Sequence, residues 1–121
     1  MTNQPFRMLA CQIDIPAMTT AEDRDAHLEV SAAKVRAALR KAPADLVVLP
    51  ELSSIDYSRA AFENLYDLAE PFDGASFVCW RQVAREFNCH IAYSFARRDG
   101  DVYYICLAVV NPEGTLIGHY D

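Results

Sequence analysis

The stretch Asp45-Leu-Val-Val-Leu-Pro-Glu-Leu52 decides the fold class of this chain. Residues 45–50 are almost wholly apolar, and a short run of this composition is typical of a strand that is buried on both faces. A helical pattern lies directly before this run, and a buried strand that follows a helix indicates a βαβ unit with a parallel pair of strands. We therefore expect an α/β fold.

The segment before this strand predicts one more strand and a long helix. Residues Phe6–Ile15 place apolar side chains on one face at a period of two, as a strand does. Residues Thr19–Lys41 predict a helix with its entry, because Thr19 and Glu22 have the spacing of a capping box and Pro43 closes the segment. Acidic residues gather at the start of this helix and basic residues at its end, which suits the helix dipole.

The segment after residue 52 predicts two further helices and a β-rich end. The helices are expected at Ser58–Ala69, with Ser58 as the N-cap, and at Asp73–Phe87, which carries an apolar stripe. Asp99-Gly100 is a strong hairpin signal. The strands are expected at His90–Ala96, Val102–Val110 and Thr115–Tyr120. The expected fold class is therefore α/β, with a mixed sheet and helices on one face.

Composition and charge argue against several functions. The chain has 121 residues, a net charge of −6 and a pI of about 4.9, which fit one acidic domain. This charge balance argues against nucleic acid or an anionic membrane surface as a partner. No apolar run approaches the roughly 20 residues that cross a bilayer and no secretory signal is visible, so a cytoplasmic protein is expected. In that reducing compartment all four cysteines are expected to be free: Cys11, Cys79, Cys89 and Cys106.

Glu51 is the residue that stands out as a candidate for chemistry. It follows directly on the predicted buried strand, and ligands of parallel α/β sheets gather beyond the carboxyl ends of the strands. We expect Glu51 to be half desolvated there, and burial would make its carboxylate a better general base near neutral pH. The alternative is a loop glutamate that faces solvent or pairs with an arginine to stabilise the turn.

Further segments fall into a recognisable order around this glutamate. Tyr57 lies six residues after Glu51. The other segments are Ala10-Cys11-Gln12, Leu68-Ala69-Glu70, Asp73-Gly74, residues 109–114 and Gly118-His119-Tyr120. Together with residues 45–52 they resemble the motifs of the nitrilase superfamily of carbon–nitrogen hydrolases. The resemblance spans essentially the whole chain, which it identifies as the N-terminal part of a single domain, residues 1–121, incomplete at the C-terminus.

The resemblance implies a catalytic set of a glutamate, a lysine and a cysteine. The cysteine thiolate attacks an amide or nitrile carbon and forms a thioester-type intermediate, while the lysine stabilises the developing oxyanion. By resemblance Glu51 is the general base, and Tyr57 matches an aromatic residue of the glutamate loop, for which a role in substrate binding is expected. Neither a metal nor an organic cofactor is required. The implied substrate is a small non-peptide amide or a nitrile, with an amidase preferred.

The rest of the implied catalytic set lies beyond Asp121. In the family the lysine follows directly after a segment like residues 118–121, and the cysteine comes later, after another strand. Lys34 and Lys41 belong to the first predicted helix and do not match, and none of the four cysteines has the context of the nucleophile. Cys89 beside His90 is no catalytic pair, because adjacent strand residues point to opposite faces. The chain alone is therefore expected to be inactive.

The resemblance also implies how the complete fold is assembled. The family forms an α-β-β-α sandwich, of which this chain would supply about half, with one sheet and two or three helices. The open face of that sheet would be apolar, so a homodimer or a higher homo-oligomer is expected. Asp56 stands where the family often has a glycine, and its carboxylate would either select a polar or cationic substrate or face solvent.

Two other classes of function are weighed against the hydrolase. A non-catalytic binding or scaffold protein could retain half of the fold, with an interface in place of the missing sheet. A nucleotide-binding α/β domain would need a glycine-rich phosphate loop, but the four glycines of the chain do not cluster. A metal site is not expected, because the spacing of Cys79, Cys89 and His90 is not that of a zinc knuckle, and His27 and His119 are isolated histidines.

Overall fold

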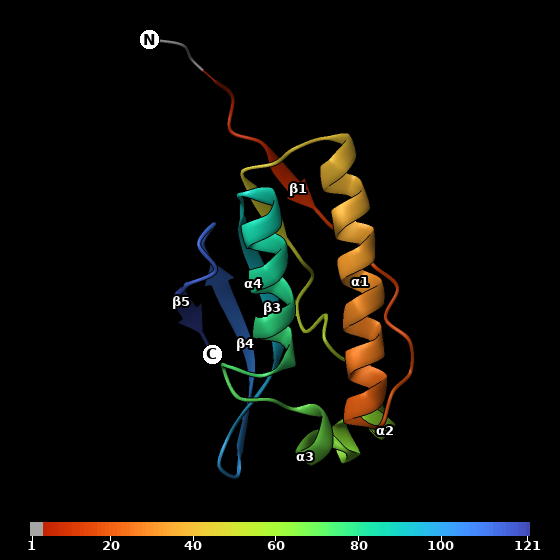
Figure 1. Cartoon of the computed structure of the whole chain (residues 1–121). Coiled ribbons are helices and arrows are strands. Elements are labelled where there is room, and N and C mark those ends of the chain that lie inside the picture. The colour runs from red at the N-terminus through yellow and green to blue at the C-terminus, as the bar shows by residue number, and fades with distance from the viewer. Residues whose placement is uncertain (1–3) are drawn as a thin grey trace.

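The computed structural model describes residues 4–121, which form a five-stranded sheet with helices (Figure 1). The strands follow one another in the sheet in chain order: β1 (Met8–Ala10), β2 (Leu46–Val48), β3 (His90–Asp99), β4 (Val102–Val110) and β5 (Leu116–Tyr120). Strands β1, β2 and β3 are parallel, whereas β4 and β5 are antiparallel to their neighbours. The expected mixed sheet and the βαβ unit are thereby confirmed.

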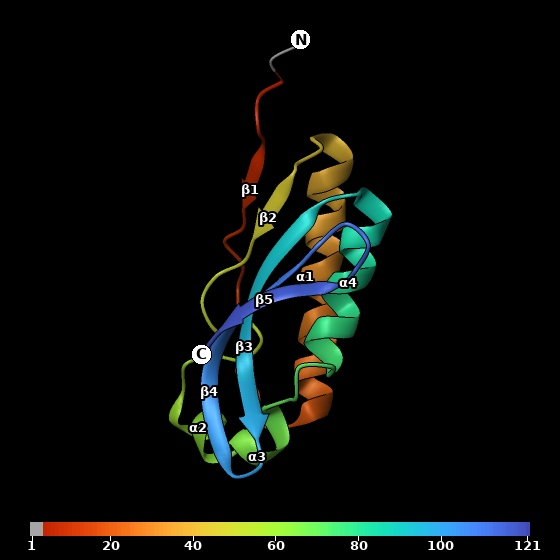
Figure 2. The same ribbon diagram turned by 90° about the vertical axis from the view of Figure 1, so that its left-hand side faces the viewer.

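Two long helices cover one face of this sheet. Helices α1 (Ala21–Lys41) and α4 (Ala75–Phe87) lie side by side on the same face, as Figures 1 and 2 show together. Two short helices, α2 (Arg59–Glu63) and α3 (Leu65–Leu68), lie at the end of the sheet near the β3–β4 turn. No helix within residues 4–121 is both long enough and apolar enough to cross a membrane.

The helix boundaries correct two expectations. The cap of α1 is Thr20, whose side chain accepts a 3.1 Å hydrogen bond from the Asp23 amide, one residue later than the expected Thr19–Glu22 pair. Ser58 does cap a helix, but the expected helix over residues 58–69 is divided at Asn64. The Asn64 side chain donates to the carbonyl of Ala60 at 2.8 Å, which is the local bonding by which asparagine ends helices.

The strand before α1 is shorter than its sequence pattern predicts. Only Met8–Ala10 of the expected Phe6–Ile15 is strand, because its partner β2 offers only Leu46–Val48 for pairing. Strand β2 is also not buried on both faces: Val47 is fully buried, whereas Leu46 and Val48 are half-buried. The helices cover only one side of the sheet, and this leaves the opposite side chains partly open.

The main core lies between the sheet and the two long helices. Trp80 and Val83 of α4 pack there against Ile91 and Phe95 of β3. A second, smaller core lies under the short helices and includes Leu52. On the other face of the sheet the apolar side chains are exposed, among them Ile105, Leu107 and Tyr120. The expected open apolar face is therefore present within residues 4–121.

Candidate active site

Glu51 lies directly beyond the carboxyl end of β2, at the edge of an open depression. The depression has a volume of about 360 Å³ and is lined by Leu49, Glu51, Ser94, Ile105, Leu107 and Tyr120. The lining residues of β3, β4 and β5 belong to the open face, because Leu107 pairs with Ser94 and with Tyr120 in the sheet register. The sequence predicts the position of Glu51, but not that the site is shared by four segments.

Glu51 is exposed, and the expectation that it is half desolvated is wrong for residues 4–121. The depression lies on the open side of the sheet, which the long helices do not cover. Tyr57 is close to Glu51: partial burial raises the pKa of its hydroxyl, and the neighbouring Glu51 carboxylate raises it further. The Tyr57 ring packs edge-on against Phe62 at 6.0 Å between centroids, which holds the aromatic side chain beside the glutamate.

The backbone that follows Glu51 turns sharply and is buried. Leu52 has a φ of 50°, a left-handed conformation that is uncommon for a residue other than glycine. Its side chain is only 1% exposed, and residues 53–55 are buried as well. The Leu52 amide donates to Ser94 Oγ at 2.8 Å, and the Ala96 amide donates to Ser54 Oγ at 3.3 Å. Strand β3 thus holds the loop at two places.

Residues from the beginning of the chain hold the same loop from the other side. His27 of α1 is buried, and its Nε2 lies 2.8 Å from the carbonyl oxygen of Ser53. The Met18 amide donates to Asp56 Oδ1 at 3.1 Å. Asp56 is half-buried, and its carboxylate ties the loop to the entry of α1; it is not among the residues that line the depression. The sequence pattern contains no signal for these contacts, which join residues 26 and 38 positions apart.

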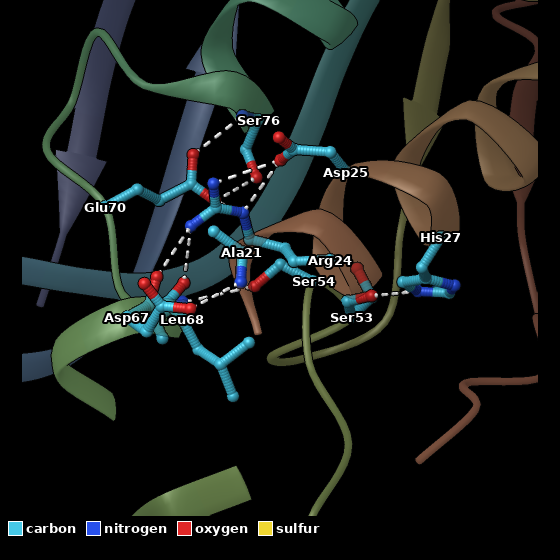
Figure 3. A network of polar contacts seen from close by, with 11 residues as sticks. Ala21, Arg24, Asp25, His27, Ser53, Ser54, Asp67, Leu68, Glu70 and Ser76 are labelled. Carbon is cyan, nitrogen blue, oxygen red and sulfur yellow. Dashed lines mark hydrogen bonds and ion pairs between the residues drawn. The ribbon is translucent and has the colours of Figure 1, made fainter. Parts of the chain in front are cut away.

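A separate polar network joins α1 to the start of α4 (Figure 3). Glu70, which is 2% exposed, accepts hydrogen bonds from the amide and the hydroxyl of Ser76, both at 2.7 Å. Arg24 lies 3.8 Å from the Glu70 carboxylate and donates to the carbonyl of Leu68 at 2.8 Å. Burial raises the pKa of Glu70, while the hydrogen bonds from Ser76 and the charge of Arg24 lower it. None of the residues of this network lines the depression.

Cys106, His119 and Asp121 form the one group of potential metal ligands within residues 4–121, with ligand atoms within 4.8 Å of one another. Sequence analysis treats Cys106 as a buried thiol and His119 as an isolated histidine, and only the pairing of β4 with β5 brings them together. Arg97 already forms a bidentate ion pair with Asp121, and burial is the main reason that the pKa of the Cys106 thiol rises to about 12. A protonated thiol and a paired carboxylate are poor metal ligands.

The remaining cysteines and lysines do not approach Glu51. All four cysteines are free thiols. Burial raises the pKa of Cys11 and Cys89, and it raises that of Cys79 to about 12, so thiolate formation is disfavoured at each. Lys34 and Lys41 belong to α1, on the covered face of the sheet. Residues 4–121 thus contain the glutamate but bring no lysine or cysteine to it.

Comparisons with known proteins identify relatives of this chain. The carbon–nitrogen hydrolase family model matches residues 9–121. A nitrilase of Pyrococcus abyssi (strain GE5 / Orsay) is 37% identical over 81 residues, which are 66% of this chain and 30% of that protein. A citrullinase of Francisella tularensis subsp. tularensis (strain SCHU S4 / Schu 4) is 29% identical over 79 residues, 64% of this chain and 28% of that protein. The chain thus spans less than a third of the length of these curated relatives.

Solved structures show the same fold. An N-terminal amidase superposes with a TM-score of 0.80 at 20% identity, over 95% of this chain and 27% of that one. A carbon–nitrogen hydrolase from Helicobacter pylori G27 gives a TM-score of 0.73 at 20% identity, over 95% of this chain and 38% of that one. Fold and site define an α/β protein with a carboxylate at the carboxyl end of a parallel strand. The chain belongs to the carbon–nitrogen hydrolase family, of the nitrilase superfamily.

Proposed function

We propose that this chain is the glutamate-bearing part of a hydrolase that cleaves the C–N bond of a small non-peptide amide, or of a nitrile. Glu51 acts as the general base: it takes the proton of a cysteine thiol and later activates water. The observation that carries the proposal is the position of Glu51, which lies beyond the carboxyl end of a parallel strand and opens onto a depression of about 360 Å³. Tyr57 lies close to Glu51, and its aromatic ring is proposed to contact substrate, although Tyr57 does not line the depression formed by the described residues.

The register of β5 supports a role for the residue after Asp121. Tyr120 pairs with Leu107 and lines the depression, whereas Asp121 pairs with Arg97. Side chains alternate between the two faces along a strand, so a residue at position 122 would point to the same face as Tyr120. A lysine there would face Glu51 across the depression and could stabilise the developing oxyanion. The nucleophilic cysteine would come from a later strand, and residues 1–121 alone are proposed to be inactive.

The open face of the sheet suggests how the site becomes enclosed. Ile105, Leu107 and Tyr120 are 45%, 42% and 77% exposed, although all three are large and apolar or aromatic. An apolar face of this kind favours association. We propose that a second layer of the same domain covers it in the complete protein and that the protein is a homo-oligomer. Covering the face would also remove water from around Glu51, which strengthens a carboxylate as a base.

The proposal is tested by replacing the base. The protein expressed from its complete reading frame should release ammonia from members of a panel of small amides and nitriles. The change Glu51→Gln should lower kcat by about 10²–10⁴-fold, the usual contribution of a general base. The matched control is Glu63→Gln, which replaces an exposed glutamate that pairs with Arg59 four residues away and should leave kcat unchanged. Full activity of the Glu51→Gln protein would exclude the proposed base.

A second candidate function is a non-catalytic binding or scaffold protein of the same fold. The open apolar face is the observation that favours it, because a partner could occupy that face directly. The sequence of the gene downstream of the Asp121 codon separates the two functions. An in-frame lysine followed by a later cysteine after a strand-like run supports the hydrolase, whereas a stop codon supports the scaffold.

A further inference from the structure

The Glu51 side chain is exposed, so its direction depends on the backbone that carries it. That backbone is held immediately after Glu51 by two buried polar side chains from different elements. We propose that Ser94 of β3 and His27 of α1 are positioning residues, which fix the loop after Glu51 and thereby aim its carboxylate into the depression. The inference rests on the proposed role of Glu51 as the general base.

Ser94 holds the first residue of the loop. It is 5% exposed, and its Oγ accepts a 2.8 Å hydrogen bond from the Leu52 amide. Leu52 has a φ of 50°, a conformation that a leucine keeps only where its surroundings hold it. The Leu52 side chain is 1% exposed and packs in the second core, so both the amide and the side chain of Leu52 are held in place. Ser94 and Glu51 both line the depression.

His27 holds the next residue. It is 4% exposed, and its Nε2 lies 2.8 Å from the carbonyl oxygen of Ser53 (Figure 3). A carbonyl oxygen can only accept, so Nε2 carries the proton and donates. The Ser54 hydroxyl then accepts from the Ala96 amide at 3.3 Å. Three successive residues after Glu51 are thus tied in turn to β3, to α1 and again to β3.

This arrangement fixes the loop from both sides of the site. Strand β3 contributes Ser94 from the floor of the depression, while α1 reaches the loop from the covered face of the sheet. A catalytic group that is displaced by about 1 Å can lose about 100-fold in rate, although it is still present. Loss of either hydrogen bond should therefore lower kcat. KM should change little, because His27 is buried and does not line the depression, and Ser94, which does line it, already uses its Oγ to accept from the Leu52 amide.

The experiment uses the protein from its complete reading frame, with the small amide that gives the highest turnover as substrate. Ser94→Ala and His27→Leu should each lower kcat by about 10- to 100-fold, with KM within about 2-fold of the wild type. Ser94→Thr keeps the acceptor oxygen and His27→Gln keeps a donor at the position of Nε2, so both should recover most of the lost kcat. Ser76→Ala is the matched control, a buried hydroxyl that binds Glu70 at the start of α4, and it should retain kcat.

A second readout does not depend on turnover. Hydrogen exchange of the Leu52 amide should be slow in the wild type and in Ser76→Ala, and at least about 10-fold faster in Ser94→Ala, because the acceptor is lost. Ser94 and His27 lie on different elements. If one of the two variants does not fold, the other variant still tests the positioning role. Equal exchange of the Leu52 amide in the wild type and in Ser94→Ala would overturn the role of Ser94.

The two proposals fail in different ways. Full activity of Glu51→Gln removes the general base and with it the proposed function. An inactive Glu51→Gln protein together with wild-type kcat in Ser94→Ala and His27→Leu overturns the positioning role alone. Loss of kcat in Ser76→Ala to the same extent would also overturn it, because the effect would then follow stability and not the direction of Glu51.

Discussion

Arg97 and Asp121 form a bidentate ion pair that bridges two strands which are not neighbours in the sheet. Arg97 Nε lies 2.9 Å from Asp121 Oδ1, and Nη2 lies 2.6 Å from Oδ2. Arg97 belongs to β3 and Asp121 follows β5, so the pair reaches across β4. The guanidinium also lies 4.5 Å from the ring centroids of both Phe72 and Tyr104. The pair fixes the end of β5, the edge strand next to the Glu51 depression.

Loss of this pair should destabilise the protein and change its response to acid. Arg97→Gln should lower the free energy of unfolding by about 1–3 kcal/mol, the range for hydrogen bonds to charged groups. The Arg97 guanidinium holds the pKa of Asp121 below its ordinary value, so the stability it contributes is present above that ordinary pKa and is lost as pH falls through the lowered one. Urea unfolding between pH 2 and pH 7 measures both effects.

The ion pair has a matched control and a reciprocal variant. Arg98→Gln removes a half-buried arginine that donates to the carbonyl of Tyr66, and it should cost less than about 1 kcal/mol. Exchange of the two charges, Arg97→Asp with Asp121→Arg, should recover part of the stability that either single change loses. Additive losses in the double variant would show that the two side chains do not interact.

Glu70 should make the folded state less stable as pH rises. Burial raises its pKa above the ordinary value of 4.5, so the folded state binds the proton more tightly than the unfolded state does. The resulting stability is fully present below pH 4.5 and is lost as pH rises through the raised pKa. Glu70→Gln removes this titration. The free energy of unfolding of the variant should therefore rise relative to that of the wild type as the pH increases from 4 to 8. Parallel stability curves for the two proteins would contradict this.

Tyr93 should be replaceable by phenylalanine without loss. Its side chain is 1% exposed, and its hydroxyl has no hydrogen-bond partner within residues 4–121. Burial raises the pKa of this hydroxyl strongly, as expected for a group that is kept from water. A buried polar group without a partner costs about 1–3 kcal/mol, so Tyr93→Phe should leave stability unchanged or raise it by up to that amount. Thermal unfolding measures the change, and a drop in Tm would reveal a partner for the hydroxyl.

Asn88 ends α4 in a left-handed conformation with a φ of 51°. Asparagine tolerates this region better than most residues, and glycine tolerates it without cost. We therefore expect Asn88→Gly to be neutral or slightly stabilising and Asn88→Ala to cost about 1 kcal/mol. Urea unfolding of the two variants gives the comparison. Equal stability of the alanine and glycine variants would show that the conformation relaxes in solution.

The sequence alone determined most of the elements and the place of the candidate base. Strand β4 has the predicted bounds, Val102–Val110, and Ser58 caps a helix as expected, because strands, turns and caps depend on residues close together in the chain. The position of Glu51 after the strand β2 follows from the same local signals, and so does the order of motifs that resembles the family.

The tertiary structure alone decided which side chains surround Glu51 and how much water reaches it. Ser94 and His27 hold the loop after Glu51 through contacts between residues 42 and 26 positions apart, and no local pattern encodes such contacts. The same holds for Asp56, whose carboxylate accepts a hydrogen bond from the Met18 amide 38 positions away. The exposure of Glu51 depends on what covers the open face of the sheet, and burial is a property of the packed whole, not of neighbours in sequence.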